Sequence, residues 1–424
     1  MAFKRPITLI AVVLLSSAAA FAQQIKVSDV TQTISFLASD EMRGRQVYSP
    51  EIDKAADFIA AEFKKAGLLP FGGSSYLQSF VMVSATQQAI NVQSAGKDID
   101  SKNIVVLTSK PELSLSTANM QVEMIKAGDN LFSKAFEYAG SGKSLLIKVD
   151  ESFSDRFSRL VFLKRNFFKT DTDIVFVLGN IDTKDLSIKA THTIKENKLA
   201  NVVGVLPGKK LKDEYVIFSG HYDHIGTGKP ENGDSIYNGA NDDASGITAI
   251  IELAKHFKAQ KNNERTLVFA AFTAEEVGGF GSQYFSKQLS PEKVIAMFNI
   301  EMIGTDSKWG KNSAYITGYE KTNMGDILQK NLKGSAFNFH PDPYPDQQLF
   351  YRSDNATLAR LGVPAHTIST SKMDSEPNYH KASDEVKTLD LINMTEIIKS
   401  IAISAQTIVS GKDTPTRVDT KELK

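Results

Sequence analysis

The chain has 424 residues, enough for one large domain or two ordinary ones, each with its own hydrophobic core. Basic and acidic residues are equal at 49 each, which argues against a nucleic-acid-binding protein because such proteins carry a basic excess. Hydrophobic residues make up 42% and charged residues 23%, as in an ordinary soluble globular protein.

The first 22 residues have the pattern of an export signal. A basic start and an apolar run at 7–15 lead to a small-x-small cleavage site at 20–22. A transmembrane anchor is the alternative, but the apolar run is short and ends in small residues rather than charges. The chain contains no cysteine for a disulfide or a lipid anchor. We therefore expect cleavage between Ala22 and Gln23, and a periplasmic or secreted protein that is not attached to a membrane.

Residues 27–70 are predicted to form a helix, a loop and a second helix. Apolar residues recur with helical spacing through 52–63, and Gly67 is expected to end that helix. The charged stretch at 40–45 is predicted to be a solvated loop.

Residues 86–198 are richer in β-forming residues and are predicted to be a β-rich insertion. Short runs of such residues occupy 144–149 and 173–178, and 186–195 alternates between apolar and polar residues like a half-buried strand.

Two features of this insertion resemble functional ones but have simpler explanations. The basic-aromatic segment 156–169 has the composition of a polymer-binding surface, yet a helix that packs its Phe side inward is the favoured interpretation. His192 lies on a predicted strand and is expected to be an ordinary surface residue.

After the insertion the pattern alternates between strand and helix. Apolar strands are predicted at 215–218, 266–272 and 294–300, with helices at 247–257 and 391–409. Such strands imply a largely parallel sheet that is covered on both faces. We therefore predict an α/β fold, a three-layer sandwich in which helices flank a largely parallel, mixed central sheet.

Five short motifs in this region carry imidazoles or carboxylates, and four of them directly follow an apolar run. These are ligands that divalent metals such as zinc accept, and open α/β sheets bind ligands beyond the carboxyl ends of their strands. The series predicts a two-metal hydrolytic centre. The motifs are Ser219-Gly-His221-Tyr-Asp223-His224, Gly239-Ala-Asn-Asp242-Asp243, Thr273-Ala-Glu275-Glu276, Asn299-Ile-Glu301 and Tyr379-His380-Lys-Ala-Ser-Asp384.

Two histidines stand out because each has an aspartate close by in the sequence. Asp223 follows His221 by two residues, and Asp384 follows His380 by four. Metal-bound imidazoles usually donate their second N–H to a carboxylate, although a structural hydrogen bond is the favoured interpretation of each pair taken alone. His224 is a further possible ligand, ranked below His221.

The two carboxylate pairs also have two interpretations each. Asp242-Asp243 precedes a predicted helix, so it is either a helix cap or a bridge between two cations with a neighbour that stabilises the turn. Glu275-Glu276 follows a buried strand, where two adjacent carboxylates repel each other unless cations lie nearby. One glutamate would then bind metal while the other moves protons.

The order of these motifs resembles that of the M28 metallopeptidases, a family of co-catalytic zinc aminopeptidases that also contains carboxypeptidases and glutaminyl cyclases. The resemblance covers roughly 200–395, and 27–70 is similar to the N-terminal segment of that family. It implies a peptide substrate, two zinc ions per chain, and a catalytic domain formed by 23–85 and 199–424. The insertion at 86–198 occupies the position at which many members carry a protease-associated β domain.

The resemblance also implies roles for the motif residues. His221 and Glu276 serve opposite metals, Asp242 bridges them, Glu301 completes the site beside His221, and His380 completes the other. The remaining roles are a general base, which is Glu275, and supporting carboxylates, which are Asp223, Asp243 and Asp384.

The chain departs from the family pattern at two positions. Glu301 stands where the family usually has aspartate, which extends the carboxylate by one methylene. Asn355 replaces the histidine of a Ser-Asp-His stretch near the specificity pocket.

The leading prediction is an exported two-zinc aminopeptidase that removes N-terminal residues from peptides through an activated water molecule. One alternative is a single-zinc aminoacyltransferase like the glutaminyl cyclases, which the Asp242-Asp243 pair and His221 disfavour. The others are a carboxypeptidase of the same family and a non-catalytic, metal-stabilised peptide-binding protein. The presence of Glu275 disfavours the non-catalytic protein.

Overall fold

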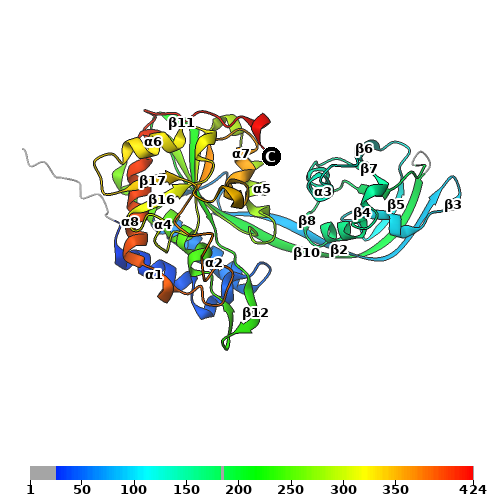
Figure 1. Cartoon of the computed structure of the whole chain (residues 1–424), viewed down its shortest axis with the longest axis horizontal. Coiled ribbons are helices and arrows are strands. Elements are labelled where there is room, and N and C mark those ends of the chain that lie inside the picture. The colour runs from blue at the N-terminus through cyan, green and yellow to red at the C-terminus, as the bar shows by residue number, and fades with distance from the viewer. Residues whose placement is uncertain (1–24, 183–185, 424) are drawn as a thin grey trace, which may run out of the picture.

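The computed structural model describes residues 25–182 and 186–423, which form two lobes of unequal size (Figure 1). The predicted export signal, residues 1–22, lies outside the described residues. Within the described ranges, no helix combines the length and the apolar character needed to cross a bilayer.

A mixed sheet forms the centre of the larger lobe and continues into the smaller one. The neighbouring strands β14, β11, β15 and β18 are parallel, whereas β10 runs antiparallel to both β14 and β2. In the described part of the chain this sheet has 12 strands. They are β1 (Leu69–Pro70), β2 (Leu77–Ser94), β3 (Lys97–Asp98), β5 (Glu112–Ser116), β8 (Phe167–Phe168), β10 (Leu186–Leu206), β11 (Leu211–His221), β14 (Arg265–Phe272), β15 (Val294–Ile300), β16 (Ser313–Ile316), β17 (Asn338–Pro341) and β18 (Ala365–Ser369).

Successive side chains of a buried strand point to opposite faces of the sheet, and here both sets are apolar. Helices therefore cover both faces of the sheet. Val216 and Phe218 of β11 belong to a core shared with α1, α2, α4, α6 and α8, whereas Ile217 packs with α5 and α7. The predicted three-layer α/β fold is confirmed. The helices are α1 (Val27–Leu37), α2 (Pro50–Lys65), α4 (Ser245–Gln260), α5 (Phe280–Ser286), α6 (Met324–Asn331), α7 (Asn355–Ala359), α8 (Leu391–Ser404) and α9 (Gln406–Val409).

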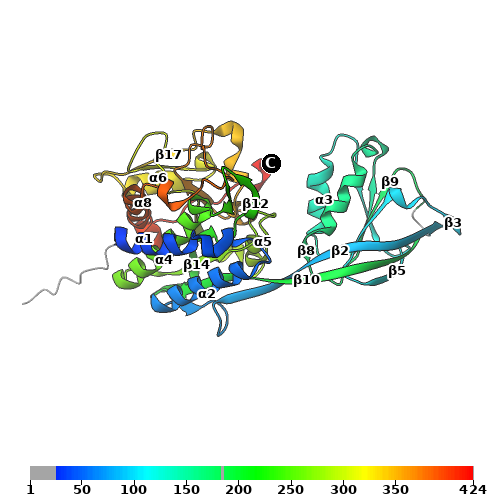
Figure 2. The ribbon, with the colours of Figure 1, turned by 90° about the horizontal axis from the view of Figure 1, so that it is seen from below.

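The smaller lobe is built on the long antiparallel ribbon of β2 and β10, which joins it to the larger lobe (Figure 2). Its described residues form a second sheet and one α-helix, which enclose an apolar core of their own. The boundaries expected for the insertion, at 86 and 198, fall inside the two ribbon strands. The further elements of this lobe are β4 (Ile104–Leu107), β6 (Gln121–Ile125), β7 (Leu145–Val149), β9 (Ile174–Leu178) and α3 (Leu131–Ala139).

Two local expectations in the smaller lobe are corrected by the structure. His192 is buried rather than a surface residue, because it lies on the same side of β10 as Leu186, Ile188 and Ala190. The segment 156–169 contains the expected helix with Phe157 buried, but this helix, η4 (Phe157–Lys164), is a 3₁₀-helix rather than an α-helix.

The ribbon leaves the larger lobe at a defined edge of the sheet. β10 runs antiparallel to β14, with Val202 opposite Ala271. The part of β10 that precedes Val202 therefore extends past the carboxyl end of β14. The smaller lobe projects from the edge at which the parallel strands end.

Candidate metal centre

Three parallel strands end at this edge and bring the predicted ligands together. His221 is the last residue of β11, Glu275 and Glu276 follow β14, and Glu301 directly follows β15. Asp242 lies in the π-helical turn η5 (Ala240–Ala244), after the hairpin β12 (Gly226–Glu231) and β13 (Asp234–Tyr237). All lie beyond the carboxyl ends of the strands, where open α/β sheets bind their ligands.

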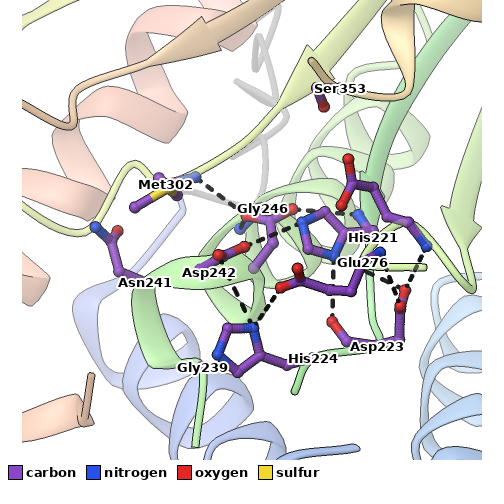
Figure 3. Close-up of polar contacts among 12 residues, drawn as sticks. His221, Asp223, His224, Gly239, Asn241, Asp242, Gly246, Glu276, Met302 and Ser353 are labelled. Carbon is purple, nitrogen blue, oxygen red and sulfur yellow. Dashed lines mark hydrogen bonds and ion pairs between the residues drawn. The ribbon is translucent and has the colours of Figure 1, made fainter. Parts of the chain in front are cut away.

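Asp242 occupies the middle of the cluster, between His221 and His224 (Figure 3). Its Oδ1 is 3.1 Å from Nε2 of His221, and its Oδ2 is 3.3 Å from Nε2 of His380. Nε2 of His380 is also 3.2 Å from Oε2 of Glu276. One carboxylate therefore meets imidazoles on two sides, as a bridging ligand must.

The ligand atoms fall into two groups that share Asp242. One group contains His221, Asp242 and Glu301, and the other contains His224, Asp242 and Glu276. Within each group the candidate ligand atoms all lie within 4.8 Å of one another. The arrangement can hold two cations that have one carboxylate in common.

His224 lies closer to the centre than its sequence ranking indicated. Its Nδ1 is 2.7 Å from Oε1 of Glu276, and its side chain is buried. The sequence signal was available, because His224 belongs to the same motif as His221. Sequence spacing alone could not decide between them, since Glu276 follows a different strand.

The chemistry of these atoms suits divalent cations. Nε2 of His224 and Oε2 of Glu301 are buried and form no hydrogen bond. Buried polar atoms without partners are costly, and metal coordination would satisfy those that point into the cluster. An imidazole and carboxylate donor set of this kind fits zinc.

The electrostatics of the cluster show a shortage of positive charge. Burial raises the pKa of Glu301 to about 7. Burial also raises the pKa of Glu275 well above its ordinary value; His221 opposes this rise, and the carboxylate of Glu301 adds to it. Although burial alone would lower it, the carboxylates of Asp242 and Glu276 raise the pKa of His380 to about 10. Glu275 and Glu301 therefore hold protons more strongly than ordinary carboxyl groups, and Asp242 and Glu276 favour a proton on His380. Bound cations would neutralise this negative charge instead.

The three supporting aspartates bind backbone amides. Asp243 accepts hydrogen bonds from the amides of His221, Gly246 and Met302, and so joins β11, α4 and the turn after β15. Asp384 accepts from the amides of Asn241 and Asp242, at 2.8 and 3.0 Å. It holds the turn that carries Asp242, and this differs from the partnership with His380 that the sequence suggested.

Asp223 has an analogous role beneath the two glutamates. Its carboxylate accepts hydrogen bonds from the amides of Glu275 and Glu276, at 3.1 and 3.2 Å. Nδ1 of His221 lies 3.1 Å from the backbone oxygen of Asp223 and 3.8 Å from its Oδ1. The second nitrogen of His221 therefore faces this backbone oxygen more closely than the carboxylate.

Arg45 is a residue of this region that sequence reasoning missed. The stretch 40–45 was expected to be a solvated loop, but Arg45 is fully buried. Its guanidinium donates to the backbone oxygens of Leu37, Tyr222, Asn238 and Gly239. It ties the N-terminal helices to the segments that carry His221 and Asp242, and these contacts span up to 194 positions in sequence.

Comparison with known proteins agrees with this geometry. The model of a protein family described as "Peptidase family M28" matches residues 201–404. This range contains every predicted site residue. This part of the chain belongs to the M28 peptidases. The N-terminal helices and the smaller lobe lie outside the matched range.

Curated relatives of the chain are named as peptidases. It is 32% identical over 209 residues to a probable leucine aminopeptidase of Trichophyton verrucosum, a match that covers 47% of this chain and 54% of that protein. It is 37% identical over 112 residues to a probable zinc metalloprotease of Pyricularia oryzae, covering 26% of this chain and 22% of the other. The chain thus spans about half the length, or less, of these relatives.

Solved structures resemble the whole chain in fold. An aminopeptidase from Aneurinibacillus sp. strain AM-1 matches with a TM-score of 0.54 and 18% identity, over 96% of this chain and 98% of that one. A zinc aminopeptidase from Bacillus subtilis matches with a TM-score of 0.54 and 16% identity, over 92% and 97%. At these identities the likeness concerns the fold alone.

Proposed function

We propose that the chain is an exopeptidase with two zinc ions, and that it removes N-terminal residues from peptides. The observation that carries the proposal is the pair of ligand groups that share Asp242. Membership of the M28 peptidases and the names of the relatives support the same reaction.

The proposed ligands follow from the contacts at Asp242. His221 and Glu301 would hold one ion, and Glu276 and His380 the other, with Asp242 between them. Bound zinc would polarise the scissile carbonyl and lower the pKa of a water molecule. His224 would orient Glu276 through its 2.7 Å contact, or replace His380 as ligand.

Glu275 is the proposed general base. It is adjacent to the ligand Glu276, and the amides of both residues are fixed by Asp223. Its pKa is raised by burial, so its carboxylate has a high affinity for a proton. A carboxylate with these properties can accept a proton from the attacking water and pass it to the leaving amine.

The alternatives receive less support. A single-zinc cyclase-like enzyme would need only one of the two ligand groups. A non-catalytic binding protein would not need a carboxylate at Glu275. We further propose that 23–85 and 199–424 form the catalytic domain and that 86–198 is an insertion in it.

Metal analysis and a substrate panel test this function together. We expect about two zinc ions per chain and release of the first residue from peptides with a free α-amine, because a carboxylate-rich site favours a cationic end. A chelator should abolish the activity, and added zinc should restore it. The matched substrate control is the same peptide with its N-terminus acetylated. Equal rates on both would reject the aminopeptidase, and one zinc ion with full activity would favour the cyclase-like alternative.

We also propose that the protein is exported and cleaved after Ala22, on the basis of the pattern in residues 4–22. N-terminal sequencing of the protein recovered from the periplasm or medium should begin at Gln23. Recovery of the intact N-terminus from the membrane fraction would contradict both the cleavage and the localisation.

A further inference from the structure

An apolar cleft lies between the two lobes, next to the candidate metal centre. We call it the interlobe cleft. Its volume is about 350 Å³, which is within the range of small-ligand pockets. Phe136, Leu163 and Phe168 line it from the smaller lobe, and Val277, Gly278 and Phe280 line it from the larger one.

A residue that lines the cleft is the next residue in the chain after one of the candidate ligands. Val277 directly follows Glu276, and β10 carries the smaller lobe past the carboxyl end of β14, where both glutamates lie. A hydrogen bond of 2.9 Å joins Tyr48 of the larger lobe to Asn166, which also lines the cleft. The smaller lobe is thus held against the rim of the centre.

Two residues that line the cleft, Phe168 and Phe280, belong to an aromatic cluster that spans both lobes. The rings of Phe168 and Phe280 meet edge to face with centroids 5.5 Å apart, and those of Phe80 and Tyr284 stack at 4.8 Å. Such packing gives the cleft a preformed base. The side chains above it are open to solvent, with Phe136 52% and Val277 38% exposed.

A second, smaller pocket includes Glu301 of the centre in its lining and has a different character. Its volume is about 40 Å³, and Glu301, Met302 and Tyr379 contribute to its lining. It also has charged groups, the Glu301 carboxylate and the guanidinium of Arg352. By contrast, none of the described residues that line the interlobe cleft is charged.

These two pockets indicate how a peptide crosses the centre. A cationic α-amine is stabilised near the Glu301 carboxylate, whereas an uncharged cleft would desolvate it without compensation. The amino end of the substrate therefore belongs at the smaller pocket. The part of the peptide beyond the scissile bond then extends past Glu276 toward Val277 and Phe136.

We propose that the interlobe cleft is a subsite for an apolar side chain on the carboxyl side of the scissile bond. The substrate class is a peptide of at least three residues with an aromatic or large aliphatic side chain beyond its first residue. The smaller lobe thus takes part in substrate selection. This inference rests on the proposed function, because only an aminopeptidase places that part of a peptide there.

The test compares Leu-Gly-Gly with Leu-Phe-Gly and Leu-Gly-Phe, three peptides that differ only beyond the first bond. Wild-type kcat/KM should be at least about tenfold higher for the better Phe-containing peptide, as expected when most of a Phe side chain is buried. Phe136→Ser should bring this ratio close to one, because the Phe-containing peptides would lose their apolar contact.

The matched control is Val161→Ser. Val161 has the same exposure of 52% and lies in the same lobe, but it lines a different cleft. It should keep the wild-type ratio, and thermal unfolding should show that both variants are folded. Hydrolysis of all three peptides at equal rates, or a ratio that Phe136→Ser leaves unchanged, would overturn the subsite alone. Hydrolysis of none by the wild type would overturn the proposed function and the subsite with it. A dimer that Phe136→Ser dissociates would show that a second copy covers the cleft, and would also overturn the proposal.

Discussion

Glu275→Gln should lower kcat by about 10²–10⁴-fold while the zinc content stays at its wild-type value. Glutamine has nearly the same shape as glutamate, so the turn after β14 should keep its hydrogen bonds to Asp223. Glutamine cannot accept a proton from water, however, and the reaction would lose its base. The measurement is kcat on a free-amine peptide, with zinc determined on the same sample.

Glu276→Gln is the matched control, since it makes the same chemical change one residue away. Oε1 of Glu276 faces His224 and Oε2 faces His380. Loss of this carboxylate should therefore weaken metal binding and activity together. Excess zinc should then restore part of the activity of Glu276→Gln and none of that of Glu275→Gln. If Glu275→Gln lost the metal and Glu276→Gln kept it, the two roles would be reversed.

Arg45→Met should lower the free energy of unfolding by about 3–5 kcal/mol, the range found when one partner of a buried charged interaction is removed. Methionine fills a similar volume but cannot donate to the four backbone oxygens that Arg45 satisfies. The substitution also removes a buried positive charge that interacts with several aspartates, among them Asp384 and Asp223. Urea denaturation of the metal-free proteins measures the difference without a contribution from zinc binding.

Arg43→Met is the control for this change. Arg43 and Arg45 both have positive φ, of 43° and 46°, so the backbone demands at the two positions are alike. Arg43 is exposed, and its replacement should change stability by less than about 0.5 kcal/mol. Equal losses for the two variants would show that the backbone of this turn, rather than the buried guanidinium, determines stability.

The parts of the fold that sequence predicted well are those in which local pattern decides structure. The strand expected at 294–300 is β15, and the helix expected at 247–257 lies inside α4, because each buries an unbroken apolar surface. The motifs that follow buried strands also came together, since parallel strands end at one edge of a sheet.

The features that sequence missed depend on contacts between distant segments. The burial of Arg45 depends on backbone oxygens nearly 200 positions away, and no local pattern in 40–45 reports them. The role of His224 depends on its contact with Glu276, a residue that follows a different strand. His192 is a different case, because the alternation of its own strand already placed it on the apolar side.

The continuity of β10 has a mechanical consequence. A single strand of 21 residues pairs with β14 in one lobe and with β2 and β5 in the other, with no loop between them. A hydrogen-bonded ribbon is stiffer than a flexible linker, and its natural deformation is twist rather than rotation about a hinge. The width of the interlobe cleft is therefore governed by the twist of the ribbon. Substitutions along its exposed face, remote from every candidate ligand, would change the spacing between Phe136 and Val277 and so the size of side chain that fits between them.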